Sequence, residues 1–160
     1  MKSKIKYILF LVIYFFSTLC NANEAQSFWI SSITNERFKS KDTKGPYIVS
    51  FFFVGCIPCE KEIPELYEYI SNEFPQIPLL FIDPIKDDSL KMIKKYARKL
   101  KVPKKYFYKD SFGTIASKFS MDKRGYPTIF GVNGKEYIFI LNGLKKDSLN
   151  FIKYKILENI

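Results

Sequence analysis

The 160-residue sequence contains no histidine. Without an imidazole, nucleophilic catalysis by Ser-His or Cys-His pairs is excluded. Haem attachment through Cys-x-x-Cys-His is excluded as well, because Glu60 follows the cysteines of this spacing, Cys56 and Cys59. Zinc bound by that pair would need two further ligands, and the chain offers no second cysteine pair. We therefore expect no metal site and no bound cofactor.

The sequence also lacks an apolar run long enough to span a membrane. The longest run, 7–19, has 13 residues, whereas a spanning helix needs about 20. It follows three lysines and precedes small residues up to Ala22, which is the layout of a secretory signal peptide. We predict a leader at 1–22 and a mature domain at 23–160 in the periplasm or another extracytoplasmic compartment. An uncleaved anchor and lipidation at Cys20 are the alternatives, and either would hold the protein at a membrane.

Acidic residues are outnumbered by basic ones. The formal net charge is +10, and it falls to +7 once the three leader lysines are removed. The basic residues gather at 91–105. They alternate with an apolar stripe at helical spacing, made of Leu90, Ile93, Ala97 and Leu100. This pattern favours a solvated helix face over an anionic partner, and we expect no nucleic acid partner.

Apolar periodicity predicts the element order β-α-β-α, a short helix, and then β-β-α. Buried strands are expected at 47–54 and 77–82, the two strands of an antiparallel hairpin at 128–132 and 136–141, and short edge strands within 28–40. Helices are expected at 58–73, in the basic segment ending near 100, at 114–119 and around 149–156. Asn133-Gly134 should form the two-residue turn of a final hairpin. The order predicts an α/β fold with a central mixed β-sheet flanked by α-helices.

The stretch Cys56-Ile57-Pro58-Cys59 stands where a buried strand runs into a helix. Unpaired N–H groups and the dipole at a helix N-terminus stabilise a thiolate, which is the nucleophile of disulfide exchange. We therefore assign Cys56 as the attacking residue and Cys59, one turn further in, as the residue that resolves the mixed disulfide. A purely structural disulfide is the alternative, although so short a loop would constrain the unfolded chain only slightly.

Three motifs together resemble the thioredoxin superfamily. The pattern Cys-x-Pro-Cys-x-x-Glu-x-Pro, from Cys56 to Pro64, is similar to that of the exported TlpA/ResA/CcmG-like branch. The stretch from Asp110 to Ala116 resembles that branch's Asp-x-x-Gly-x-x-Ala, and Gly125-Tyr126-Pro127-Thr128 precedes the predicted hairpin. The resemblance covers about 28–157. It implies a thioredoxin-like fold and thiol–disulfide oxidoreductase activity through a redox-active disulfide.

The resemblance also assigns roles to single residues. The proline that matches Pro127 is cis in the family and faces the cysteine pair, so Tyr126 and Pro127 become a substrate-binding edge; a simple turn proline is the alternative. Glu62 becomes the acid/base group for the cysteine protons, although a plain surface glutamate fits the position as well. Ser50 stands where cytoplasmic thioredoxins carry a buried aspartate. Gly55 replaces a tryptophan general in the family, which leaves the redox potential and substrate surface open.

The resemblance further implies that the protein reduces disulfides in exported proteins, cytochrome c maturation being the best-known task of the family. A membrane thiol reductant would supply the electrons, and we expect a monomer. An oxidant or isomerase of the same chemistry is one alternative. A non-catalytic envelope binding module of the same fold is another.

Overall fold

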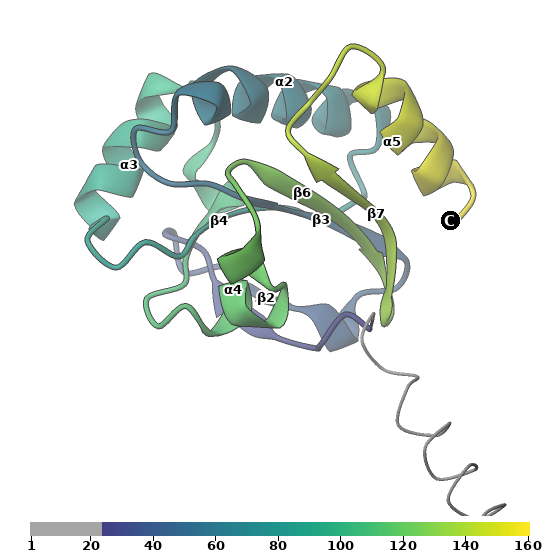
Figure 1. The fold of residues 1–160 in the computed structure, drawn as a ribbon, viewed down its shortest axis with the longest axis horizontal. Coiled ribbons are helices and arrows are strands. Elements are labelled where there is room, and N and C mark those ends of the chain that lie inside the picture. Colours follow the sequence, from purple (N-terminus) through teal and green to yellow (C-terminus); the bar gives the residue numbers. More distant parts are fainter. Residues whose placement is uncertain (1–23) are drawn as a thin grey trace, which may run out of the picture.

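The computed structural model describes residues 24–160, and Figure 1 shows them as a twisted sheet with helices on its faces. The leader predicted at 1–22 and Cys20 lie outside these residues. Within 24–160, no helix combines the length and the apolar character needed to cross a membrane.

A five-stranded mixed sheet forms the centre of the molecule, in the spatial order β5-β4-β3-β6-β7. Its strands are β3 (Pro46–Phe51), β4 (Leu79–Asp83), β5 (Phe107–Lys109), β6 (Thr128–Asn133) and β7 (Glu136–Asn142). β3, β4 and β5 are parallel, whereas β6 and β7 run antiparallel to their neighbours. Every residue of the central strand β3 is buried, as expected for a strand covered on both faces. Because β3 and β4 are parallel neighbours, their carboxyl ends lie side by side at one edge of the sheet.

Helices cover one face of this sheet, and the other face carries the N-terminal segment and a short helix (Figure 1). The first face holds α2 (Ile57–Glu73), α3 (Leu90–Lys99) and α5 (Ser148–Leu157), and the second holds α4 (Thr114–Lys118). The apolar core under α2 and α3 includes Cys56 and Cys59. The core on the opposite face is built from aromatic rings packed around Phe119. The cysteine pair thus belongs to the α2–α3 side of the sheet.

The predicted α/β fold, a central mixed sheet flanked by helices, is confirmed, and the two predicted buried strands and both strands of the hairpin are present. The sequence pattern did not predict β5. This strand has only three residues, so it is too short to show a periodic apolar pattern, and its pairing with β4 holds it in the sheet. The strands expected within 28–40 are β1 (Trp29–Ser31) and β2 (Arg37–Lys39), which form a separate two-stranded sheet rather than edges of the main one.

The prediction of the hairpin turn was wrong by one residue. Asn133 still pairs with Glu136 in the ladder, so the turn consists of Gly134 and Lys135. Gly134 has a φ of +59°, whereas the φ of Asn133 is not positive. The positive φ of the turn therefore falls on glycine, which adopts it without steric cost.

The predicted apolar stripe of the basic helix also needs one correction. Ile93, Ala97 and Leu100 are buried as expected, but Leu90 is exposed. Leu90 is the first residue of α3 and projects from the open end of the helix, and Tyr96 supplies a buried ring instead.

Candidate active site at the start of helix α2

Cys56 and Cys59 lie at the amino end of α2 and are joined by a disulfide, with their Cα atoms 5.2 Å apart. Cys56 is the N-cap of the helix, and its Sγ accepts the backbone N–H of Cys59 at 3.3 Å. In this oxidised form the exposed fractions are only 2% for Cys56 and 0% for Cys59. Ile57, next to Cys56, is 83% exposed, so the outer surface of the cysteine loop is open to a partner.

The loop from β3 to α2 positions Cys56. The N–H of Phe52 donates to the Ile82 carbonyl at 3.1 Å, which extends the contact between β3 and β4. The N–H of Cys56 donates to the Phe53 carbonyl at 3.2 Å. Gly55 completes this turn with a φ of +91°, a backbone angle that favours glycine. A tryptophan at this position would be strained at that angle.

Tyr126 and Pro127 lie beside this loop. The Tyr126–Pro127 peptide bond is cis. The ring of Tyr126 packs edge-on against Phe53 with the ring centroids 5.5 Å apart, so it contacts the loop that carries Cys56. Tyr126 is half-buried, and Pro127 is buried just before β6. The structure therefore brings the predicted substrate edge to the cysteine loop.

Glu62 lies in α2 with its carboxylate turned toward the loop between β7 and α5. Its Oε2 accepts the N–H of Leu144 at 2.7 Å. Gly143 leaves room for this contact, because a Cβ there would come within 3.1 Å of Oε1. Burial raises the pKa of Glu62 above its usual value, and the hydrogen bond from Leu144 offsets part of that rise. A specific backbone contact thus holds Glu62 in place.

A second carboxyl group, Asp83, lies at the carboxyl end of β4 and has no exposed surface. Its Oδ1 accepts the N–H of Ile85 at 2.8 Å and the ammonium group of Lys109 at 3.3 Å. Among residues 24–160, its Oδ2 finds no hydrogen-bond partner. The pKa of Asp83 is raised to about 7, chiefly by burial and in part by Asp88, against the opposing effects of Ile85 and Lys109. One feature of the sequence points to Asp83, because this aspartate follows directly on an apolar run.

Two side chains link this region to the cysteine loop. Asp88 lies before α3 and accepts the N–H of Val54 through Oδ2 at 2.8 Å. Tyr96 of α3 donates its hydroxyl to the Cys56 carbonyl at 3.4 Å, and its ring stacks on Phe52 with the centroids 5.7 Å apart. Burial raises the pKa of Tyr96, so its hydroxyl stays protonated and remains a donor at neutral pH. Neither Asp88 nor Tyr96 was predicted as a site residue from the sequence.

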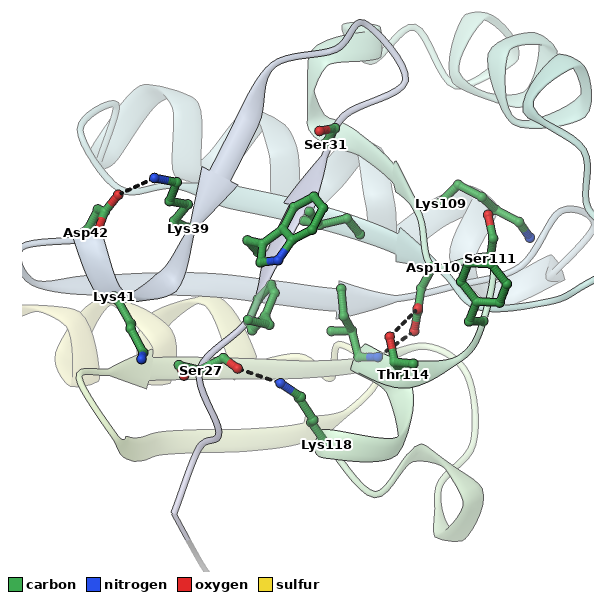
Figure 2. A pocket seen from close by; sticks show the side chains of 15 residues that line it. Ser27, Ser31, Lys39, Lys41, Asp42, Lys109, Asp110, Ser111, Thr114 and Lys118 are labelled. Atoms are coloured by element: carbon green, nitrogen blue, oxygen red, sulfur yellow. Dashed lines mark hydrogen bonds and ion pairs between the residues drawn. The ribbon is translucent and has the colours of Figure 1, made fainter.

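An open groove lies away from the cysteine pair, between β1, residues 39–42 and the segment from Lys109 to Lys118 (Figure 2). Lys118 donates to the Ser27 carbonyl at 2.6 Å across this groove. Asp110 Oδ2 accepts the N–H groups of Ile115 and Ala116 in the first turn of α4, so Asp110 has a structural role in the stretch 110–116. Over the described range 24–160, no three His, Cys, Asp or Glu side chains gather as a metal site would require.

No family model matches this sequence, and a search of curated proteins found no match. Solved structures do match. A thiol:disulfide interchange protein of the thioredoxin family from Chlorobium tepidum has 20% sequence identity and a TM-score of 0.69, covering 86% of this chain and 98% of that one. StoA from Bacillus subtilis has 18% identity and a TM-score of 0.68, covering 82% and 96%. A secreted disulfide oxidoreductase from Mycobacterium tuberculosis has 13% identity and a TM-score of 0.63, covering 82% and 95%. The chain therefore has the thioredoxin fold, as its sequence predicted.

Proposed function

We propose that this protein is an extracytoplasmic thiol–disulfide oxidoreductase that reduces disulfides in exported proteins, apocytochromes c among them. The observation that carries the proposal is the disulfide pair Cys56 and Cys59 at the amino end of α2, on a thioredoxin fold. This position favours a thiolate once the pair is reduced. The similar solved structures include proteins described as a thiol:disulfide interchange protein and a disulfide oxidoreductase, which supports the same chemistry here.

Cys56 acts first in the proposed reaction. In the reduced protein its thiolate attacks one sulfur of a substrate disulfide, a mixed disulfide forms, and the other substrate sulfur leaves as a thiolate. The N–H of Cys59, which points at Cys56 Sγ at 3.3 Å, stabilises negative charge on the attacking sulfur. The dipole of α2 favours the same charge because Cys56 caps the helix.

Cys59 completes the exchange. Its thiol gives up a proton, and its sulfur attacks Cys56 Sγ, which releases the second substrate thiolate and forms the disulfide within the protein. Two electrons thus pass from the protein to the substrate, and a membrane dithiol reductant returns two electrons and two protons. Glu62, one helical turn after Cys59 and with a raised pKa, is the group that we propose accepts the Cys59 proton.

Tyr126 and Pro127 form the proposed substrate edge. Proline has no N–H to donate, so an extended substrate segment beside Pro127 would pair with the backbone of Tyr126. The contact between Tyr126 and Phe53 supports this role, because a segment bound there lies next to the loop of Cys56.

Insulin reduction by the purified protein tests the activity. We expect the wild type to accelerate insulin reduction by dithiothreitol, and Cys56→Ser to remove the acceleration. Cys59→Ser should accumulate a mixed disulfide through Cys56, visible by mass spectrometry and sensitive to added reductant. In protein purified with the leader retained, Cys20→Ser is the matched control and should keep full activity. A wild type that is inactive with every reductant supports a binding module and contradicts the proposal.

The reduction potential decides between a reductase and an oxidant of the same fold. We expect a value closer to that of thioredoxin, about −270 mV, than to that of the strong oxidant DsbA, about −120 mV. Equilibration with glutathione buffers measures it. A potential near the oxidant value would overturn the reductase assignment and leave the exchange chemistry intact. Trapping substrates in cells with Cys59→Ser would then show whether apocytochromes c are among them.

We infer that residues 1–22 direct export and that 23–160 work in an extracytoplasmic compartment. The basic start, the short apolar run and the small residues before Asn23 support this inference. N-terminal sequencing of the protein from fractionated cells should give a chain that begins at Asn23. An intact N-terminus in the membrane fraction indicates an anchor instead, and a lipid on Cys20 indicates a lipoprotein.

A further inference from the structure

Asp83, Asp88 and Lys109 form a buried charged cluster, called the Asp83 cluster below. Asp83 has no exposed surface, Asp88 is 7% exposed, and the side chain of Lys109 is 9% exposed. Asp83 pairs with the ammonium group of Lys109 and has Asp88 as a second carboxyl neighbour, so the cluster holds an excess negative charge when both carboxyls are ionised. Buried unbalanced charge is costly, and uptake of a proton relieves it. The excess negative charge therefore favours the retention of one proton by the Asp83 cluster.

Strand alternation places the Asp83 cluster on the same side of the sheet as the cysteines. Asp83 stands two residues after Phe81 on β4, and Lys109 stands two residues after Phe107 on β5. Both phenylalanines belong to the core that contains Cys56. Because side chains two residues apart on a strand share a face, Asp83 and Lys109 lie on the α2–α3 side. The cluster and the disulfide thus share one side of the sheet.

A hydrogen bond connects the cluster to the cysteine loop. Asp88 Oδ2 accepts the N–H of Val54 at 2.8 Å, two residues before Cys56. Asp88 also acts on Asp83, because its charge and its side-chain hydrogen bond raise the pKa of Asp83. The backbone that carries Cys56 is therefore attached to the cluster.

The charge of Asp83 also reaches two tyrosines that contact this loop. Burial, then Glu60 and Asp83, raise the pKa of Tyr96, whose hydroxyl donates to the Cys56 carbonyl. Burial and then Asp83 raise the pKa of Tyr126, whose ring packs on the loop. The charge of Asp83 thus acts on two side chains that contact the cysteine loop.

We propose that Asp83 is a positioning residue whose buried charge controls the ionisation of the Cys56 thiol. An ionised Asp83 opposes the Cys56 thiolate, and a protonated Asp83 permits it. In return, a thiolate at Cys56 holds the proton on Asp83 more tightly, because coupling between two sites is reciprocal. This deepens the function proposed above and rests on it, yet thiol ionisation is measurable without turnover. The charged and titratable groups that face Asp83 are Asp88, Lys109, Tyr96 and Tyr126.

The pH dependence of Cys56 alkylation tests the proposal. In reduced Cys59→Ser protein, the rate of reaction with iodoacetamide follows the thiolate fraction of Cys56. We expect a broadened curve with an inflection at or above pH 7, because Asp83 titrates near pH 7 when Cys56 carries no charge and at higher pH beside the thiolate. Asp83→Asn in the same background should give a single-site curve whose midpoint is lower by about half a unit to one pH unit, the effect of removing one nearby buried charge.

Lys109→Met supplies a second variant with a different signature. Loss of the ammonium group leaves Asp83 more strongly protonated, so the inflection should move to higher pH rather than disappear. A merely structural role for the pair would move neither curve. Lys153→Met is the matched control, because Lys153 pairs with Glu73 at the far end of α2 and should leave the curve unchanged.

Carbon-13 NMR of the wild type measures the coupling without any variant. The Asp83 carboxyl should titrate near pH 7 in the oxidised protein and at higher pH in the reduced protein. Equal midpoints in the two forms, or alkylation curves of parent and Asp83→Asn that superimpose, overturn the proposal. These shifts without insulin reduction would refute the proposed function and leave the control of thiol ionisation by Asp83 standing.

Discussion

Two regions that adjoin the cysteine pair each contribute a carboxyl group with a raised pKa, and they hold it differently. On α2, Glu62 is half-buried and its Oε2 is bonded to Leu144 at 2.7 Å. At the ends of β4 and β5, Asp83 has no exposed surface and faces Lys109. Solvent reaches the first carboxyl and not the second. We infer that Glu62 exchanges protons during turnover, whereas Asp83 acts through its charge.

The activities of two variants should distinguish these two roles most clearly. Glu62→Gln should lower kcat/KM for insulin reduction at pH 7 by about a hundredfold, the usual contribution of a positioned proton acceptor. Asp83→Asn should change it by less than about tenfold, because it shifts thiol ionisation without removing the acceptor. Glu68→Gln, at an exposed glutamate on the same helix, is the control. Equal losses in the Glu62 and Glu68 variants would remove Glu62 from the mechanism.

The next effect concerns the pH dependence of stability. The pKa of Asp83 in the fold, about 7, lies above its unfolded value of about 3.9. A carboxyl with a raised pKa stabilises the fold below the unfolded value, and this stability is lost as pH rises toward the folded value. The free energy of unfolding of the oxidised wild type should therefore fall between about pH 4 and pH 7, by on the order of 2 to 4 kcal/mol from this group.

Urea unfolding at a series of pH values measures this loss. Asp83→Asn should show a shallower decline than the wild type, and Asp122→Asn, at an exposed position, should follow the wild type. Parallel curves for the wild type and Asp83→Asn would mean that Asp83 is ionised in the fold at all these pH values.

A smaller effect is expected from a substitution at Gly143, which should move the carboxylate of Glu62 without changing its charge. Gly143 has a φ of +77°, and a Cβ there would lie 3.1 Å from Glu62 Oε1. Gly134 has a φ of +59°, and within the described chain a Cβ there would meet nothing within 4 Å. Replacing either glycine by alanine should cost about 1 to 2 kcal/mol of stability through the backbone angle. Only Gly143→Ala should also alter the pH profile of insulin reduction. Identical profiles for the two variants would contradict the role of the contact with Glu62.

The smallest effect is expected at an exposed ion pair beside the site. Lys99 contacts Glu60 at 2.6 Å, and their side chains are 60% and 34% exposed. Lys99→Met should change the free energy of unfolding by about 0.2 to 1 kcal/mol and leave the alkylation curve of Cys56 in place. A shift as large as that of Asp83→Asn would show that surface charge, rather than burial, controls the thiol.

Local motifs made the cysteine pair and Glu62 predictable from the sequence. Cys56, Cys59 and Glu62 fall within two turns of one helix, so their spacing alone puts them together. The positive backbone angle of Gly55, a φ of +91°, was not predictable, since the turn imposes it.

The Asp83 cluster lies beyond such local patterns. Lys109 follows Asp83 by 26 residues and meets it only because β5 pairs with β4. A strand of three residues leaves no periodic pattern in the sequence, so neither β5 nor the ion pair could be inferred. The long-range pairing of short strands was thus the feature that could not be predicted from the sequence, both for the fold and for the site.

The division of labour within the cysteine pair is tested most directly by alkylation of the reduced wild type at pH 7, with the modified cysteines mapped by peptide mass spectrometry. Cys56 caps α2, whereas Cys59 has no exposed surface. We expect Cys56 to react faster than Cys59 by about tenfold or more, as for an attacking thiolate beside a shielded resolving thiol. Equal rates, or faster modification of Cys59, would contradict it.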